Sequence, residues 1–114
     1  MKLNNSIDVI GQLYAHGYKV SRERVARISD LLWPAGDHRP SPVSHRRWTD
    51  EQVEVMRAAL VLHDDLGVSL ERIGELITEA GSAEAAVGAM AHQIEVRLQQ
   101  LQRTLADLNE RVSA

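Results

Sequence analysis

The first third of the chain carries apolar residues at the three- and four-residue intervals that predict helices. A first short helix would follow an N-cap at Ser6 and end at Gly17. Its apolar side would be formed by Ile7, Ile10, Leu13 and Tyr14. A second helix would follow an N-cap at Ser21, with a buried side formed by Val25, Ile28, Leu31 and Leu32. Two short helices joined by a turn that contains glycine form the outline of a helix-turn-helix.

The middle of the chain contains a non-helical segment and two further predicted helices. Residues 34–47 are dominated by Pro, Gly, Ser and Asp and predict a loop or short hairpin, which we call the wing. Thr49 and Gln52 have the spacing of a capping box, and the helix that they open would end at Gly67. A fourth helix would follow an N-cap at Ser69 and stop near Gly81, with an apolar side formed by Leu70, Ile73, Leu76 and Ile77.

From about residue 84 the apolar positions are spaced alternately by four and three residues, which is typical of a coiled coil. These positions are Val87, Ala91, Ile94, Leu98, Leu101, Leu105, Leu108 and Val112. Burying one leucine is worth ~1.5–3 kcal/mol, so an exposed stripe of this kind favours self-association. We expect dimer contacts through Ile94, Leu98, Leu101, Leu105, Leu108 and Val112. The alternative is a terminal helix that folds back on its own head.

These patterns predict an all-α protein with a head of four short helices and a wing, followed by a long coiled-coil helix. The head would comprise residues 1–81 and the dimerisation helix residues 82–114. The composition agrees with this, because phenylalanine is absent and only 4% of the residues are aromatic, which suits helices better than strands.

Charge is distributed unevenly along the chain, although the net charge is only −3. Residues 19–48 contain seven basic and three acidic residues, a net +4. From residue 49 onward there are five basic and twelve acidic residues, a net −7. Because the field at one face is set by nearby charges, the basic segment is a candidate surface for an anionic partner. The alternative is that both charged regions are simply solvated.

The composition gives no argument for catalysis or for a bound metal. There are no cysteines, which excludes disulfides, thiolate metal sites and a cysteine nucleophile. None of the five histidines is spaced four residues from another, and the cluster at residues 63–65 is interpreted as a solvated helix end. No phosphate-binding glycine loop or nucleophile motif is present. We expect no enzyme activity and no cofactor, and, without a leader or a long apolar run, a cytoplasmic protein without a membrane partner.

Several motifs resemble the N-terminal module of MerR-type regulators, which are winged helix-turn-helix proteins. One is the run Leu31-Leu32-Trp33-Pro34, followed by a basic loop and by Arg46-Arg47-Trp48. Another is the stretch Leu66-Gly67-Val68-Ser69-Leu70-Glu71-Arg72-Ile73. The pattern of residues 90–112 resembles the dimerisation helix of the same family, so the resemblance covers nearly the whole chain.

The chain departs from the family pattern in two places. Ala26-Arg27-Ile28-Ser29 stands where the family has an arginine, two aromatic residues and an acidic residue, and this stretch is one residue short. The wing is longer than usual and holds two extra prolines. Contacts attributed to the missing aromatic residues are therefore not carried over, and the register of the second helix stays open by one residue.

The resemblance implies specific roles for residues of the head. Ser21, Arg22 and Arg24 would face the major groove, and Arg27 would contact phosphate or form a buried ion pair. Arg46 would be the wing arginine on the DNA backbone, and Trp48 would pack the wing against the head or be a plain core residue. The full set of candidate DNA contacts is Lys19, Ser21, Arg22, Arg24, Arg27, Arg39, His45, Arg46 and Arg47.

The function implied is sequence-specific DNA binding by a homodimer that regulates transcription. Antiparallel pairing of the long helices would place two heads on a pseudo-palindromic operator, with parallel pairing left open by the sequence, and DNA distortion would follow by analogy. RNA polymerase at the promoter is the further partner implied, with a nucleoid location. Two alternatives remain: a recombination directionality factor that bends DNA, and a coiled-coil interaction adaptor without DNA binding.

Overall fold

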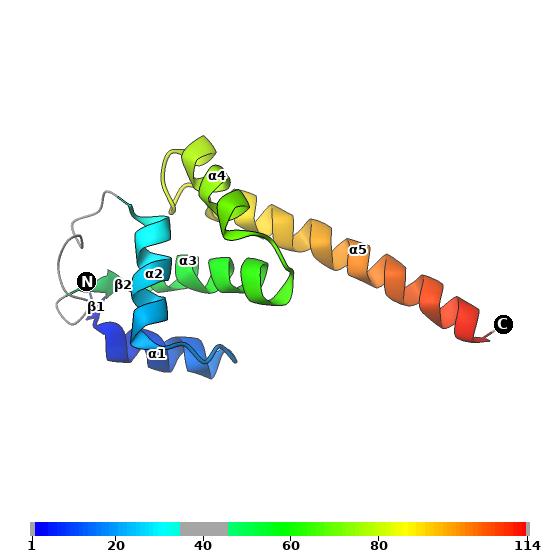
Figure 1. Cartoon of the computed structure of the whole chain (residues 1–114), viewed down its shortest axis with the longest axis horizontal. Coiled ribbons are helices and arrows are strands. Elements are labelled where there is room, and N and C mark those ends of the chain that lie inside the picture. The colour runs from blue at the N-terminus through cyan, green and yellow to red at the C-terminus, as the bar shows by residue number, and fades with distance from the viewer. Residues whose placement is uncertain (1, 35–45, 114) are drawn as a thin grey trace.

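The computed structural model describes residues 2–34 and 46–113, and within these ranges the chain is mostly helical, as predicted. Four short helices form a head, from which one long helix projects (Figure 1). This projection gives the molecule its elongated shape, with extents of 58 × 30 × 24 Å. The helices are α1 (Ser6–Ala15), α2 (Arg22–Leu32), α3 (Asp50–Leu60), α4 (Leu70–Ala80) and α5 (Val87–Ser113).

A two-stranded sheet, which the sequence analysis did not predict, joins the N-terminus to the start of α3. Strand β1 (Leu3–Asn4) pairs antiparallel with β2 (Trp48–Thr49). Asn4 is buried, and its Nδ2 donates to the Trp48 carbonyl at 3.1 Å and to Asp50 Oδ1 at 2.8 Å. Gln12 Nε2 of α1 donates to Asn4 Oδ1 at 2.9 Å. The amide of Asn4 therefore holds α1, β2 and α3 together.

The helices α2, α3 and α4 begin at the N-caps that the sequence predicted, and only the N-cap of α1 differs. Ser21 and Ser69 accept hydrogen bonds from the backbone N–H groups three residues later, and Thr49 forms the predicted capping box with Gln52. The N-cap of α1 is Asn5, not Ser6 as predicted, because the Asn5 side chain accepts from the Asp8 N–H. The Asp8 carboxylate accepts in return from the Asn5 N–H, which completes a second capping box.

The glycines predicted to end helices lie in left-handed backbone conformations. Gly17, Gly67 and Gly81 have φ values of 92°, 68° and 94°. Residues with a Cβ rarely adopt these conformations, so glycine lets the chain turn sharply after α1, before α4 and after α4. Between Leu60 and Leu66 the chain forms a π-helical turn, η2 (Val61–Asp65), where the sequence analysis predicted a continuous helix.

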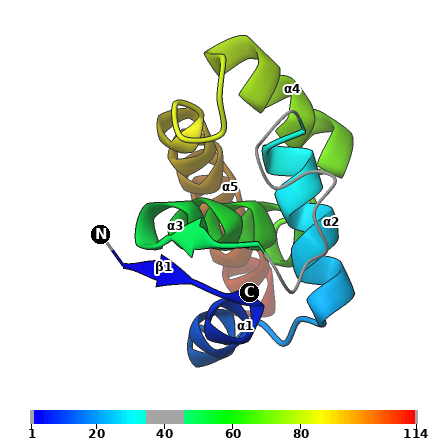
Figure 2. The same cartoon turned by 90° about the vertical axis from the view of Figure 1, so that its left-hand side faces the viewer.

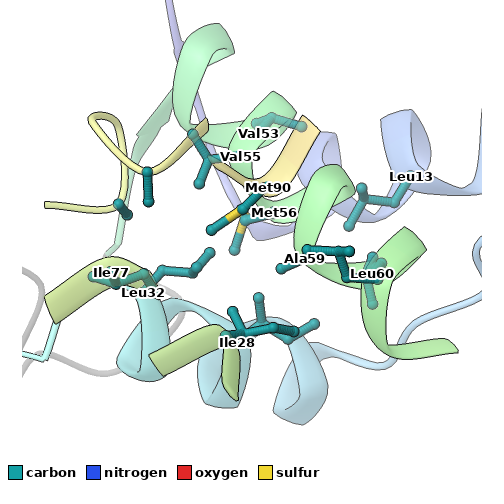
Figure 3. Close-up of a cluster of buried hydrophobic side chains, with 14 of the residues drawn as sticks. Leu13, Ile28, Leu32, Val53, Val55, Met56, Ala59, Leu60, Ile77 and Met90 are labelled. Carbon is teal, nitrogen blue, oxygen red and sulfur yellow. The ribbon is translucent and has the colours of Figure 1, made fainter. Parts of the chain in front are cut away.

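The core lies between α1, α2, α3 and α4 and takes in the first turn of α5. In Figure 3, Leu13, Ile28, Leu32, Met56 and Met90 belong to one cluster of buried side chains. Figure 2 shows α1 beneath α3, with α2 beside α3 and α4 next to α2. On α2 the predicted residues Val25, Ile28 and Leu32 are buried, whereas Leu31 is only partly buried at the edge of the core.

The apolar side of α1 was predicted incorrectly. Ile7 and Tyr14 are 66% and 67% exposed, and Val9 and Leu13 face the core instead, with Ile10 packed at its edge. The cap at Asn5 and the β1–β2 pairing fix the rotation of α1, and local spacing does not contain this information. In α4 the predicted core residue Leu70 is likewise 46% exposed.

Candidate nucleic-acid interface

The turn between α1 and α2 is closely hydrogen-bonded. The N–H groups of His16 and Tyr18 both donate to the Leu13 carbonyl, at 3.1 and 2.9 Å. Gly17 N–H donates to the Tyr14 carbonyl at 2.9 Å, and Val20 is buried just before α2 begins. These contacts close the turn that leads into α2.

Helix α2 has one buried side and one basic, exposed side. Val25, Ile28 and Leu32 pack into the core, whereas Arg22 and Arg27 are exposed. Neither arginine has an ion-pair partner among residues 2–34 and 46–113. Ser21 and Lys19 are also exposed beside the start of the helix. The structure thus places four of the predicted DNA contacts at or near the solvent side of α2.

Arg24 has a different environment, because its guanidinium forms an ion pair with Asp64 of η2. The hydrogen bond that Arg24 donates to Asp64 raises the pKa of Arg24 above its ordinary value. Arg24 and Arg27 nevertheless line one groove of about 280 Å³ between α2 and the start of α4, so they lie on the same side of α2. Arg24 is therefore positioned at the basic surface but already compensated by a carboxylate.

A second acidic residue of η2 reaches the turn before α2. The Tyr18 hydroxyl donates a hydrogen bond to Asp65. Burial, followed by this hydrogen bond and the charges of Asp65 and Asp64, raises the pKa of Tyr18 to about 12. The sequence analysis interpreted residues 63–65 as a solvated helix end; Asp64 and Asp65 are exposed, and both carboxylates also bind side chains of the α1–α2 region. His63 Nδ1 lies 2.9 Å from the Val68 carbonyl and closes the same turn.

The structure places Arg46 against the head. Arg46 is only 8% exposed, and its Nη1 donates to Asp30 Oδ1 at 3.1 Å. Arg47 is exposed, and its Nη1 donates to the Arg46 carbonyl at 2.8 Å. Arg39 and His45, the other predicted contacts of the wing, lie outside the described residues.

Trp48 is fully buried and packs next to α2. Its indole Nε1 donates to the Ser29 hydroxyl at 3.1 Å, so it joins the start of β2 to the middle of α2. Sequence reasoning missed Ser29 and Asp30 as the partners of Trp48 and Arg46. The available signal was the presence of two polar residues, Ser29 and Asp30, between apolar positions of the second helix.

A second candidate surface is the apolar stripe of α5, which we define as Leu98, Leu101, Leu105, Leu108 and Val112. The four leucines are 51–58% exposed and Val112 is 86% exposed. Ile94, predicted as a dimer contact, is partly buried against the core of its own head. The alternative prediction of a helix folded back on its head is wrong for the stripe, because α5 leaves the head and its outer half is exposed (Figure 1).

Within residues 2–34 and 46–113, no three His, Cys, Asp or Glu side chains are grouped as metal ligands. None of the helices described is both long enough and apolar enough to span a bilayer.

The chain was compared with protein-family models, with curated proteins and with solved structures, and none of them matches. Function is therefore inferred from two surfaces: the basic side of α2 and the apolar stripe of α5.

Proposed function

We propose that the chain is a sequence-specific DNA-binding transcriptional regulator of the MerR type that acts as a homodimer. The observation that carries this proposal is the orientation of α2, whose apolar side is in the core while Arg22 and Arg27 face solvent. The tight turn from α1 and the buried Trp48 next to the wing support assigning the head as a winged helix-turn-helix.

In this proposal α2 is the recognition helix and enters the major groove. Ser21 and Arg22, at its N-terminal end, contact base edges, and Arg27 contacts phosphate. Arginine suits both tasks because its planar guanidinium donates two parallel hydrogen bonds to guanine or to a phosphate. On the wing side we assign the phosphate contact to exposed Arg47, since Arg46 is paired with Asp30 inside the head.

The homodimer forms through the apolar stripe of α5. In water the stripe leaves five large apolar side chains exposed on each chain, and pairing two stripes buries them. The stripe spans fourteen residue steps, from residue 98 to residue 112, or about 21 Å of helix at ~1.5 Å per residue. Antiparallel pairing separates the two heads along the rod, which suits two half-sites on successive major grooves. Distortion of the bound DNA follows by analogy with the family.

Selection of bound genomic fragments by the purified protein tests the proposal, at two salt concentrations and with a sedimentation measurement of mass. A dimer that enriches one inverted repeat, with affinity that falls steeply as salt rises, is the expected result. Arg22→Ala should weaken operator binding about 5- to 100-fold. Arg103→Ala is the matched control, because this exposed arginine lies on α5, the helix that projects from the head (Figure 1). Binding that does not depend on salt, or no enrichment, contradicts the proposal.

Two other functions use the same surfaces and give different results in this experiment. A recombination directionality factor would use the head to bend DNA and would give a cooperative array of footprints beside an attachment site. An interaction adaptor would dimerise through the stripe of α5 without enriching any DNA. Arg22 and Arg27 of α2 are exposed and have no ion-pair partner within residues 2–34 and 46–113, which favours DNA binding over the adaptor.

A further inference from the structure

A groove of about 280 Å³ lies between α2 and the start of α4, two helices that lie next to each other (Figure 2). The residues that line it comprise apolar side chains and side chains that carry nitrogen: Ile28, Leu31, Leu70, Arg24, Arg27 and His63. Pockets that bind small molecules have volumes of about 300–1,000 Å³, so this groove has the size for a small ligand.

The apolar part of the groove is accessible to a ligand. Leu70 is 46% exposed, although its spacing predicted a core residue, and Leu31 is only partly buried at the edge of the core. Ile28 lies between them and the core and is itself buried. A hydrocarbon group bound here would leave water and would cover Leu70 and Leu31 at the same time, which is favourable. This part of the groove therefore favours a ligand with an apolar part.

The polar part of the groove is positively charged. Arg27 is exposed and has no ion-pair partner in the part of the chain that the structure describes. Arg24 is paired with Asp64, so the negative charge of Asp64 is compensated and repels an anion less. The groove also lies at the N-terminal end of α4, where the helix dipole favours negative charge. Arg27 is thus available for a carboxylate, to which a guanidinium donates two parallel hydrogen bonds.

We infer that this groove binds a small amphipathic carboxylate, with its hydrocarbon part on Leu31 and Leu70 and its charged group on Arg27. A consequence for DNA binding rests on the proposed function, in which Arg27 contacts phosphate. The carboxylate and the DNA backbone then compete for one guanidinium. The ligand lowers the affinity for DNA, and DNA lowers the affinity for the ligand by the same factor. The groove is in this sense an effector site on the recognition helix.

Octanoate tests the site, in a titration of the isotope-labelled protein followed by the NMR signals of its backbone amides. Acetate carries the charge without the chain, and octanol carries the chain without the charge. Octanoate should bind saturably with a dissociation constant of about 1 mM or below, and it should shift signals at α2 and the start of α4. Acetate and octanol should each bind at least about ten-fold more weakly. Octanoate that binds no better than either of them, or that shifts only signals along the stripe of α5, overturns the inference.

Two pairs of variants locate the binding. Arg27→Ala should weaken octanoate binding about ten-fold, whereas Arg22→Ala, on the same helix but outside the groove, should not change it. Leu70→Glu places a carboxylate in the groove and should weaken binding at least ten-fold, or about 1.4 kcal/mol. Ala80→Glu adds the same charge at the other end of α4 and should bind octanoate as the wild type does.

Both positions changed to glutamate are exposed, so these variants should fold, which thermal unfolding checks. Octanoate affinity that is equal in Leu70→Glu and the wild type, or that falls equally in the two arginine variants, would place the ligand elsewhere and overturn the inference.

Competition with DNA is measured on the enriched operator with and without saturating octanoate, at constant ionic strength. Octanoate should weaken operator binding by the wild type about five-fold and should leave operator binding by Leu70→Glu unchanged. Unchanged operator affinity of the wild type at saturation would overturn the competition. Failure of the wild type to bind any duplex would instead contradict the proposed function, and the octanoate titrations would then decide the ligand site by themselves.

Discussion

The indole Nε1 of Trp48 donates a hydrogen bond to the hydroxyl of Ser29, 3.1 Å away, and both residues are buried. The contact joins the segment that follows the wing to the middle of α2. Two residues earlier in the chain, Arg46 pairs with Asp30, the residue after Ser29. Polar contacts of Trp48 and Arg46 therefore attach this side of the head to α2, in addition to apolar packing.

Ser29→Ala should destabilise the head because it removes the acceptor for a buried indole N–H. We expect the free energy of unfolding to fall by about 1–2 kcal/mol in urea titrations. Ser113→Ala, at the exposed end of α5, is the control and should leave the midpoint unchanged. Phenylalanine has no indole N–H, so in a Trp48→Phe background Ser29→Ala should lower the free energy of unfolding by less. An equal loss of unfolding free energy in both backgrounds would show that the destabilisation does not come from losing this hydrogen bond.

Arg46→Ala should lower stability, because it removes a buried guanidinium that donates to Asp30 in a part-buried contact. The expected loss is about 1–3 kcal/mol in chemical unfolding. Arg47→Ala should lower stability less than Arg46→Ala does, since Arg47 is exposed and donates to the neighbouring Arg46 carbonyl, and it should instead weaken DNA binding. If Arg46→Ala left stability unchanged and only weakened DNA binding, Arg46 would be the backbone contact that the family resemblance implied.

Leu105→Glu should dissociate the proposed dimer. It removes one apolar side chain from each stripe, worth ~1.5–3 kcal/mol apiece, and places a charge there instead. The dissociation constant should rise about 100-fold or more, which sedimentation at micromolar concentration detects. Ala106→Glu introduces the same charge at the next residue, off the apolar stripe, and should remain dimeric. A wild-type protein that sediments as a monomer would contradict dimerisation through α5.

Stability should fall with pH in the alkaline range because the pKa of Tyr18 is raised to about 12. The unfolded chain releases this proton near the ordinary value of 10.0, whereas the folded chain keeps it up to about pH 12. The stabilisation is therefore complete below pH ~10 and is lost as pH rises toward pH ~12. Urea midpoints measured over this range should fall less for Tyr18→Phe than for the wild type. Tyr14→Phe, at an exposed tyrosine, should behave as the wild type does.

Features set by neighbouring residues were predicted well from the sequence. The caps at Ser21, Thr49 and Ser69 and the helix ends at Gly17 and Gly81 depend on contacts within a few positions. Local residue preferences contain that information. The four short helices and the long helix followed from these signals together with the apolar spacing.

Features set by distant residues were missed or predicted incorrectly. The pairing of β1 with β2 joins segments more than forty residues apart, and it fixes which side of α1 is buried. Ile7 and Tyr14 matched the helical period but face solvent, because Val9 and Leu13 are the residues that this rotation turns inward. The pairs Arg24–Asp64 and Arg46–Asp30 likewise depend on how the helices pack. Spacing along one helix does not determine such contacts.

Helix α5 belongs to the head at one end and to the proposed dimer at the other. Met90 is fully buried in the core, and eight residues later Leu98 begins the exposed stripe on the same continuous helix. The head therefore has a fixed position and rotation relative to the surface that pairs with the second copy. A slip of one heptad between two such helices would move the heads by about 10 Å, or roughly three base pairs along DNA. In the proposed dimer, the register of the leucine pairs thus sets the distance between the two half-sites of the operator.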